Sequence, residues 1–437
     1  MSRQCGNTLS CRAGSKISRY GEYMAQLYEN STAEERVILV AVQTNGDEDT
    51  EASLDELEDL AKTAGAFTAA RVIQNREAVH PGTYIGKGKI EEVRQTALAY
   101  NATGIICDDE LSPAQLNNLE QELEIKIMDR TLVILDIFAR RATTSEGKLQ
   151  VELAQLKYRQ ARLVGLRSSL SRLGGGIGTR GPGEKKLEMD RRLIQKRIAS
   201  LRRELEEVTR HRELIREKRK KGQTKVAAIV GYTNAGKSTL LNRLTDAGVL
   251  EENQLFATLD PTTRSLKLPD GQSVLLTDTV GFIRKLPHNL IEAFKSTLEE
   301  AKYADLLIHV VDASNPNMEE QMQVVYDTLR QLGADGKPVI TLFNKQDRLS
   351  SRELLRDFKA EYTIPTAAKS GEGLDALCVA LEEILKRGKI YVDRIFPYEQ
   401  AGRIQMIRSF GQLEQEEYLP EGIHVKGYVP KEIFGKI

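Results

Sequence analysis

Residues 231–238 have the types and the spacing of a loop that binds phosphate groups. The segment Gly231-Tyr232-Thr233-Asn234-Ala235-Gly236-Lys237-Ser238 follows the apolar run 226–230 and precedes a helical stretch, 239–244. Glycines at both ends let backbone N–H groups converge on an anion, and the following helix adds the positive end of its dipole. Lys237 can reach the β- and γ-phosphates, and the Ser238 hydroxyl can coordinate Mg²⁺. Such a string also arises by chance, so the residues downstream must show whether it belongs to a nucleotide site.

Two later segments supply further groups that a nucleotide site needs. Phe256-Ala257-Thr258-Leu259-Asp260 offers the hydroxyl of Thr258, which can complete Mg²⁺ coordination and sense the γ-phosphate. An Asp-Pro turn is the simpler interpretation of that segment. Asp278-Thr279-Val280-Gly281 ends a predicted strand. An aspartate at a strand end with a glycine shortly after it fits a metal-binding acid and a mobile backbone contact to the γ-phosphate.

The base is predicted by Asn344-Lys345-Gln346-Asp347, which follows a buried strand at 339–343. A carboxylate at Asp347 can accept hydrogen bonds from both N1–H and the exocyclic amine of guanine. Adenine has no matching donors, so Asp347 predicts guanine over adenine.

The composition sets limits on the class of protein. A chain of 437 residues is too long for one core, and two to four domains are expected. It contains no apolar run of about 18 residues, so we expect no membrane span. The four cysteines (Cys5, Cys11, Cys107 and Cys378) form no metal-ligand pair, and with five histidines no zinc site is expected. Reduced thiols in the cytoplasm are the simpler interpretation.

The N-terminal region alternates strand and helix signals, which predicts a small α/β domain at 30–130. The run Val37–Val42 is typical of a buried strand, and Ser112-Pro113 of a helix start. Gly86–Lys89 is too short for a second phosphate loop, so a plain turn or an RNA-contacting loop is preferred. Residues 1–29 are expected to be a disordered extension, with an organellar transit peptide as the alternative.

The middle of the chain, 131–222, predicts a long antiparallel helical hairpin. Leucines recur every seven residues at Leu149, Leu156, Leu163 and Leu170. A second heptad series comprises Leu187, Ile194, Leu201, Val208 and Ile215, with Ile198 and Leu205 between its members. Sustained heptads on two adjacent segments favour a coiled-coil seam. Between them, Gly174–Glu184 contains six glycines and one proline, so a non-regular tip is expected.

The charge of this hairpin indicates a nucleic-acid partner. Residues 157–225 contain 22 Lys and Arg against 8 Asp and Glu, although the whole chain has a formal net charge of zero. A solvated helical face is the alternative, but it would mix the signs more evenly. Basic arms with a glycine-rich tip suit insertion between RNA phosphates.

The remaining segments complete the fold class, an α/β protein of several domains. Strand signals at 226–230, 273–277, 306–312 and 339–343 predict a mixed, mostly parallel sheet in a P-loop domain at 223–388. Strand-like 390–395 and 423–429 predict a small α+β appendage at 389–437, in which no chemistry is visible.

The motif series Gly231–Ser238, Thr258, Asp278–Gly281 and Asn344–Asp347 resembles that of translation-factor-class GTPases. With Phe256–Pro261 and the tip Gly174–Glu184, the chain resembles the HflX family over about residues 35–390. The resemblance implies a Ras-like G domain that binds GTP, GDP and Mg²⁺. It also implies a cytoplasmic, monomeric GTPase that binds the large (50S) ribosomal subunit and its rRNA, not DNA, and that dissociates or rescues stalled or hibernating ribosomes under stress. Peripheral membrane association is a further expectation.

The resemblance also assigns roles to residues. Lys237, Thr258 and Gly281 would be catalytic, and Ser238 and Thr258 would bind Mg²⁺ directly, with Asp278 acting through a water. The guanine site would comprise Asn344, Lys345, Gln346 and Asp347 together with the loop Ala367-Ala368-Lys369.

Two residues depart from the usual pattern of such domains. Many carry a glutamine that orients the attacking water where this chain has Phe282, so we expect slow intrinsic hydrolysis that the bound partner accelerates. The loop beside guanine usually begins with serine and here begins with Ala367, which predicts weaker guanine binding unless backbone contacts dominate.

Two other functions stay open from the sequence. In one, the protein is an RNA-binding module that nucleotide merely orders, with incidental hydrolysis. In the other, it is an ATP-driven RNA-remodelling enzyme, which rests on Gly86–Lys89 alone.

Overall fold

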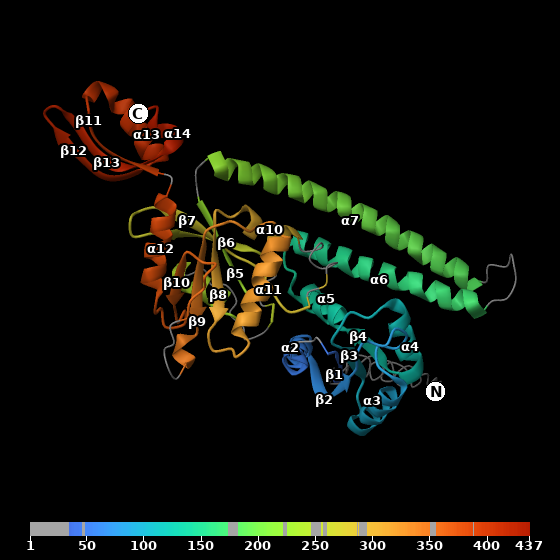
Figure 1. Ribbon diagram of the computed structural model, residues 1–437. Helices are drawn as coiled ribbons and strands as arrows, with labels where there is room; N and C mark the ends of the chain where they lie inside the picture. The colour runs from blue at the N-terminus through green and yellow to red at the C-terminus, as the bar shows by residue number, and fades with distance from the viewer. Residues whose placement is uncertain are drawn as a thin grey trace, which may run out of the picture.

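The computed structural model describes residues 35–45, 49–173, 182–221, 225–245, 255–256, 260–285, 287, 295–349, 355–387 and 389–437. Several predictions therefore concern residues outside the described ones: the extension 1–29, Ala257, Thr258, Leu259 and residues 174–181 of the hairpin tip. The side chains of Leu170, Leu187 and Ile215 also lie outside the description. The predicted mixed α/β fold is confirmed, and Figure 1 shows how its parts are arranged.

The N-terminal part is a parallel sheet in the order β2-β1-β3-β4. Its strands are β1 (Glu35–Gln43), β2 (Ala66–Asn75), β3 (Gly104–Cys107) and β4 (Lys126–Asp129). Helices cover both faces: α2 (Thr50–Thr63) and α5 (Arg130–Arg141) on one, α3 (Lys87–Tyr100) and α4 (Pro113–Leu123) on the other. Successive residues of β1 therefore enter different cores, which explains the unbroken apolar run Val37–Val42.

Of two local signals in this part, the helix start at Ser112-Pro113 is confirmed and the turn or loop at Gly86–Lys89 is not. Ser112 caps α4 with a capping box, and Pro113 occupies the first turn. Gly86 is the N-cap of α3, so Lys87–Lys89 form the first helical turn rather than a free loop.

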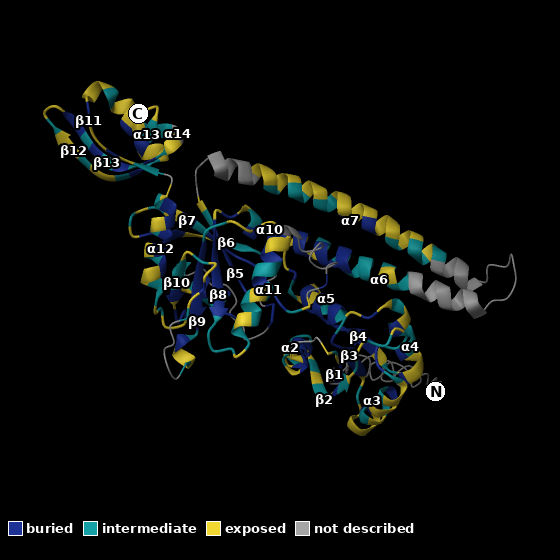
Figure 2. Ribbon diagram, viewed as in Figure 1, coloured by how far each residue is buried: buried dark blue, intermediate teal, exposed yellow. Residues whose placement is uncertain are grey.

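The hairpin consists of α6 (Ser145–Leu173) and α7 (Pro182–Lys221), which lie side by side (Figure 1). The predicted heptad positions meet at the seam, where Leu153, Ile198 and Leu201 are buried and Leu149, Leu156, Ile194 and Leu205 pack against them. Figure 2 shows α7 exposed on its outer side. Pro182–Glu184 were predicted to belong to a non-regular tip, but they form the first turn of α7. Proline is favoured at that position.

The central part is a six-stranded sheet in the order β10-β9-β8-β5-β7-β6. Only β6 is antiparallel within it. The strands are β5 (Lys225–Gly231), β6 (Thr262–Lys267), β7 (Ser273–Asp278), β8 (Leu306–Asp312), β9 (Val339–Asn344) and β10 (Tyr362–Pro365). The helices are α8 (Lys237–Thr245) and α12 (Leu374–Lys386) on one face and α10 (Lys295–Tyr303) and α11 (Met318–Gln331) on the other. A short 3-10 helix, η1 (Gln346–Arg348), follows β9.

The C-terminal part is an antiparallel sheet in the order β11-β13-β12. It contains β11 (Lys389–Phe396), η2 (Tyr398–Gln400), α13 (Ala401–Phe410), β12 (Gln412–Leu419), β13 (Gly422–Pro430) and α14 (Lys431–Phe434). The strand signals at 390–395 and 423–429 are confirmed as β11 and β13. Strand β12 was not predicted, because its glutamates and glutamines give it a weak strand signal.

Within the residues that the structure describes, no helix combines the length and the apolar character needed to cross a membrane.

Candidate nucleotide site and its contacts with the N-terminal part

The predicted phosphate loop lies at the carboxyl end of β5, between the parallel strands β7 and β8. Parallel α/β sheets bind ligands at this edge. The loop requires glycine at position 236, where φ is +99° and a Cβ atom would lie 2.3 Å from Nδ2 of Asn344. Asn234, at the exposed crest of the loop, also has positive φ, at +59°.

Lys237 is buried at the start of α8 and donates to the loop itself. Its Nζ lies 2.8 Å from the carbonyl oxygen of Tyr232 and 3.2 Å from that of Gly231. Burial lowers the pKa of Lys237 to about 8, with Asp278 opposing the shift and Lys345 adding to it. Anionic phosphate oxygens are stronger acceptors than these carbonyls, so the lysine is placed to transfer its hydrogen bonds to a bound nucleotide.

Ser238 and Asp278 form an oxygen pair suited to Mg²⁺. The Ser238 hydroxyl donates to Oδ2 of Asp278 at 2.8 Å, and Asp278 is fully buried at the end of β7. The described residues contain no cluster of three or more His, Cys, Asp or Glu that could hold a metal alone. Mg²⁺ commonly binds one or two protein oxygens together with phosphate oxygens and water, so this pair fits a metal that arrives with the nucleotide.

Asn344 ties three predicted segments together. Its Nδ2 donates to the carbonyl of Ala235 at 2.8 Å, and its Oδ1 accepts from the backbone N–H of Ala368 at 2.9 Å. Lys345 has positive φ and pairs with Asp312 at 2.6 Å. This turn leaves Asp347 exposed in η1, whereas Gln346 is buried. The structure thus brings segment 344–347, which was predicted to bind guanine, and the loop 367–369 beside the predicted phosphate loop.

The segment Asp278–Phe282 closes onto the phosphate loop. Thr279 donates to the carbonyl of Ile229 at 2.7 Å, and Val280 is buried. Thr233 N–H donates to the carbonyl of Phe282 at 2.8 Å, and Phe282 N–H donates to that of Gly231 at 3.2 Å. A Cβ atom at Gly281 would lie 2.9 Å from Nζ of Lys237. The Phe282 side chain is buried in the core, so it offers no polar group to a water molecule.

Phe256 and Asp260, which were expected at the nucleotide, contact the N-terminal half of the chain. The ring of Phe256 packs edge-on against Phe138 of α5, with 4.6 Å between centroids. Asp260 accepts hydrogen bonds from Thr143 and Thr144, which connect α5 to α6. Both described pieces of the loop between α8 and β6 are therefore in contact with α5 or with the segment that follows it.

A buried ionic network, which was not predicted, joins the N-terminal part of the chain to the central part. Arg130, at the start of α5, pairs with Glu56 and lies 2.7 Å from Asp108. Glu56 in turn accepts from the hydroxyl of Tyr232 in the phosphate loop. Burial and Glu56 raise the pKa of Tyr232, so its phenol keeps the proton that it donates.

The segment after Phe282 joins this same network. The backbone N–H of Arg284 donates to the hydroxyl oxygen of Tyr232 at 2.7 Å. The Lys285 ammonium lies 2.6 Å from both Asp108 and Asp109, at the carboxyl end of β3. The carboxyl edge of the N-terminal sheet, where such sheets often bind small ligands, here binds a lysine from the central part. Consecutive acids directly after a buried strand were the only sequence signal for this contact.

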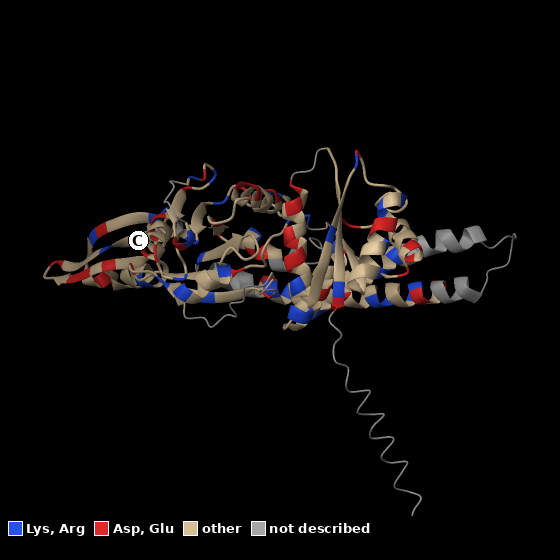
Figure 3. Cartoon of the chain, turned by 90° about the horizontal axis from the view of Figure 1, so that it is seen from below, with Lys and Arg blue, Asp and Glu red and all other residues tan. Residues whose placement is uncertain are grey.

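The charges of the hairpin are partly compensated. Arg197 of α7 makes a bidentate pair with Glu152 of α6, at 2.7 and 2.8 Å, and Arg212 lies 2.8 Å from Glu146. Figure 3 colours the Lys and Arg positions blue and the Asp and Glu positions red, and both colours occur along the described parts of the hairpin helices. Since Glu146 and Glu152 lie outside 157–225, the net positive charge of the hairpin is smaller than the count for that range indicates.

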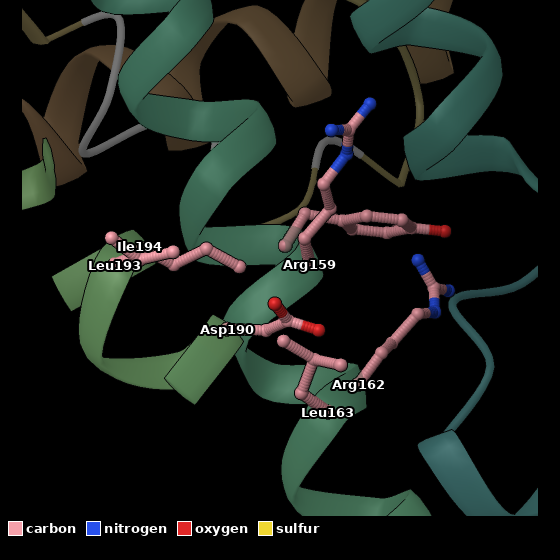
Figure 4. Close-up of a pocket in the computed structure, with 7 residues that line it drawn as sticks. Arg159, Arg162, Leu163, Asp190, Leu193 and Ile194 are labelled. Carbon is pink, nitrogen blue, oxygen red and sulfur yellow. The ribbon is translucent and has the colours of Figure 1, made fainter. Parts of the chain in front are cut away.

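A groove of about 520 Å³ opens between the hairpin helices (Figure 4). It is lined by Tyr158, Arg159, Arg162 and Leu163 of α6 and by Asp190, Leu193 and Ile194 of α7. The Arg162 guanidinium stacks on Tyr158, 3.3 Å from the ring centroid, and lies 2.7 Å from Asp129. Arg162 thus fastens α6 to the N-terminal sheet, and the groove lining is mainly apolar.

The lowered pKa of Lys237 predicts that GTP binding depends on pH. Bound phosphate would restore the lysine's ordinary pKa, so binding takes up a proton when the free lysine is neutral. Affinity should be constant below pH 8 and fall by up to about tenfold per unit above it. Calorimetric titrations at pH 9, in buffers of different ionisation enthalpy, count the protons taken up. Lys237→Met should bind weakly and without this uptake, and absence of uptake by the wild-type protein would contradict the assignment.

Asp347→Asn should change the base preference from GTP towards xanthosine triphosphate. The amide of asparagine can donate to the 2-oxo group of xanthine, whereas guanine loses a charge-assisted partner worth about 1.5–3 kcal/mol. Competition between the two triphosphates for a fluorescent nucleotide measures the change. Asp335→Asn, at another exposed aspartate of the same domain, is the matched control, and an unchanged preference in Asp347→Asn would show that the base site is misassigned.

Family models match three consecutive stretches of the chain. Residues 51–139 match the family model described as GTP-binding GTPase N-terminal, residues 141–219 that of the GTP-binding GTPase middle region, and residues 226–345 that of the 50S ribosome-binding GTPase. Among solved structures, a GTP-binding protein from the archaeon Sulfolobus solfataricus in complex with GDP is 24% identical, with a TM-score of 0.42. That match covers 80% of this chain and 99% of the other.

Relatives at the sequence level extend over almost the whole chain. The GTPase HflX of Lacrimispora saccharolytica is 66% identical over 414 residues, which are 95% of this chain and 98% of the relative. The GTPase HflX of Escherichia coli is 42% identical over 400 residues, 90% of this chain and 93% of the relative. The chain therefore belongs to the HflX family of GTPases, enzymes that bind and hydrolyse GTP.

Proposed function

We propose that this GTPase binds the large ribosomal subunit and its rRNA, and uses GTP binding and hydrolysis to dissociate or rescue stalled or hibernating ribosomes, particularly under stress. The observation that carries the proposal is a long helical hairpin that directly precedes the GTPase domain in the chain. The sequence between its two helices is rich in glycine. The match of residues 226–345 to a 50S ribosome-binding GTPase model supports the choice of partner. We further propose that it acts as a monomer in the cytoplasm, with peripheral association with membranes.

At the proposed active site, the chain's own groups bind and orient the nucleotide. Loop N–H groups and Lys237 would hold the phosphates, and Asn344–Asp347 with the backbone at 367–369 would hold guanine. Ser238, with Thr258 and with Asp278 acting through water, would hold Mg²⁺, which supplies charge stabilisation for phosphoryl transfer when bound. Gly281 would offer its backbone N–H to the γ-phosphate.

The buried Phe282 explains why a partner would be needed. Hydrolysis requires an oriented water molecule, and neither a phenyl ring nor its buried position provides that. The same observation favours the alternative function, an RNA-binding module that GTP orders and in which hydrolysis is incidental. The two functions differ in whether the ribosome accelerates the chemical step.

Single-turnover GTP hydrolysis with and without purified large subunits separates the two. If the ribosome completes the site, the rate constant at saturating GTP should rise at least about a hundredfold, a threshold below the roughly 10³- to 10⁵-fold by which partners activate other GTPases. Small subunits serve as the control RNA–protein particle. A rate that large subunits leave unchanged would reject the proposed function in favour of the RNA-binding module.

Deleting Gly174–Glu184 tests the role given to the hairpin tip. The described helix ends on either side, Leu173 and Pro182, lie at the end of the hairpin away from the central sheet (Figure 1), so GTP affinity should be unchanged. Dissociation of 70S ribosomes should be lost. Sedimentation profiles of 70S ribosomes incubated with GTP and either protein make the comparison. Dissociation by the deleted protein at the wild-type rate would refute a role for the tip.

A further inference from the structure

Asp260 belongs to the central part, yet it makes four hydrogen bonds to the segment between α5 and α6. Its Oδ2 accepts from the backbone N–H groups of Thr143 and Thr144, at 3.0 and 2.9 Å, and from the Thr143 hydroxyl at 2.7 Å. Its Oδ1 accepts from the Thr144 hydroxyl at 2.6 Å. Burial alone would raise the pKa of Asp260, but the hydrogen bonds from Thr144 and Thr143 lower it, so the carboxylate is charged.

Thr144 connects this carboxylate to the first turn of α6. While its hydroxyl donates to Asp260, the same oxygen accepts from Gly147 N–H at 3.0 Å, as an N-cap side chain does. The Thr144 carbonyl accepts the first helical bond, from Lys148 N–H at 3.1 Å. The charge of Asp260 therefore stabilises the N-terminus of the first hairpin helix, both through the cap and through the helix dipole.

Gly147 leaves room for this carboxylate. A glycine inside a helix costs about 1 kcal/mol relative to alanine. Here a Cβ atom at position 147 would lie 2.5 Å from Oδ1 of Asp260. The close approach of the carboxylate explains why a glycine occupies this helical position.

Asp260 stands between the hairpin and the proposed catalytic loop. In the sequence it follows Thr258, the proposed Mg²⁺ ligand, by two residues and precedes β6. We infer that Asp260, Thr143, Thr144 and Gly147, which we call the hairpin joint, fix the end of the loop that carries Thr258 to the base of α6. Asp260 is thereby a positioning residue for GTP hydrolysis, and it couples the state of the nucleotide to the hairpin. The role of the hairpin in this coupling rests on the proposed function.

The test uses Asp260→Asn in the full-length protein without ribosomes. One side-chain oxygen is replaced by a donor, so the four hydrogen bonds cannot all be kept. GTP and GDP affinities should stay within about threefold, while single-turnover hydrolysis at saturating GTP slows about tenfold or more, as expected when a group is displaced from its reactive position. Hydrogen exchange at the amides of Gly147 and Lys148 should become faster, and the difference in exchange between GDP and a non-hydrolysable GTP analogue should disappear.

Asp270→Asn is the matched control, because Asp270 also accepts from a backbone N–H and a side chain, those of Gln272 in the turn between β6 and β7. It should change neither the hydrolysis rate nor the exchange of α6. Thr144→Val replaces the hydroxyl with a methyl group, and it should slow hydrolysis and speed exchange at α6 as Asp260→Asn does. Thr144→Ser keeps the hydroxyl, so its hydrolysis and exchange should match those of the wild-type protein.

Two results would overturn the inference. Faster exchange at α6 with unchanged hydrolysis would make the joint purely structural, and slower hydrolysis with unchanged exchange would show that the hairpin is not connected through Asp260. Neither hydrolysis nor hydrogen exchange is measured with ribosomes present. If large subunits failed to stimulate hydrolysis by the wild-type protein, the proposed function would be rejected, but this test of the hairpin joint would remain valid.

Discussion

The buried charge of Arg130 constrains how the N-terminal and central parts are joined. Its side chain is 1% exposed, and burial would lower its pKa, but Glu56 and Asp108 raise it above the ordinary value. An unpaired guanidinium in such a place is strongly destabilising, so both acids must stay in position. Each acid also binds the central part, Glu56 through Tyr232 and Asp108 through Lys285. The two acids that pair with Arg130 therefore also hold the N-terminal sheet against the phosphate loop.

A shared hydrophobic core reinforces this junction. Leu57 of α2, Phe138 of α5, Tyr232, Phe256 and Phe282 belong to one continuous cluster of buried residues. The nucleotide loop is therefore packed against the part of the chain that leads into the hairpin. A displacement of Phe256, of Asp260 or of the segment after Gly281 would change contacts with α5, with the α5–α6 connection or with the N-terminal sheet. Among the described residues, these contacts connect the phosphate loop to the base of the hairpin.

The sequence could predict features that depend on neighbouring residues. The phosphate loop, the N-cap at Ser112 and the heptad seam around Leu201 each arise from a local pattern that acts in the same way in many folds. The guanine motif predicted a base contact, but it did not predict that Asn344 would tie Ala235 to Ala368.

Contacts between distant residues escaped prediction. Lys285 and Asp108 are 177 positions apart, and Asp260 and Thr143 are 117 apart. A single lysine or aspartate in a loop has many possible partners, and only the packing of two sheets against each other selects one. For the same reason, Phe256 and Asp260 were expected at the nucleotide, although their described contacts are with the N-terminal half.

If the nucleotide site controls the proposed ribosome-binding hairpin through these contacts, the bound nucleotide must change the affinity of the protein for the large ribosomal subunit. The most direct test of this control is co-sedimentation of the protein with large ribosomal subunits in three states: nucleotide-free, with GDP and with a non-hydrolysable GTP analogue. We expect binding with the analogue to be at least about tenfold tighter than with GDP, a coupling free energy of about 1.4 kcal/mol. Equal binding in all three states would contradict this control.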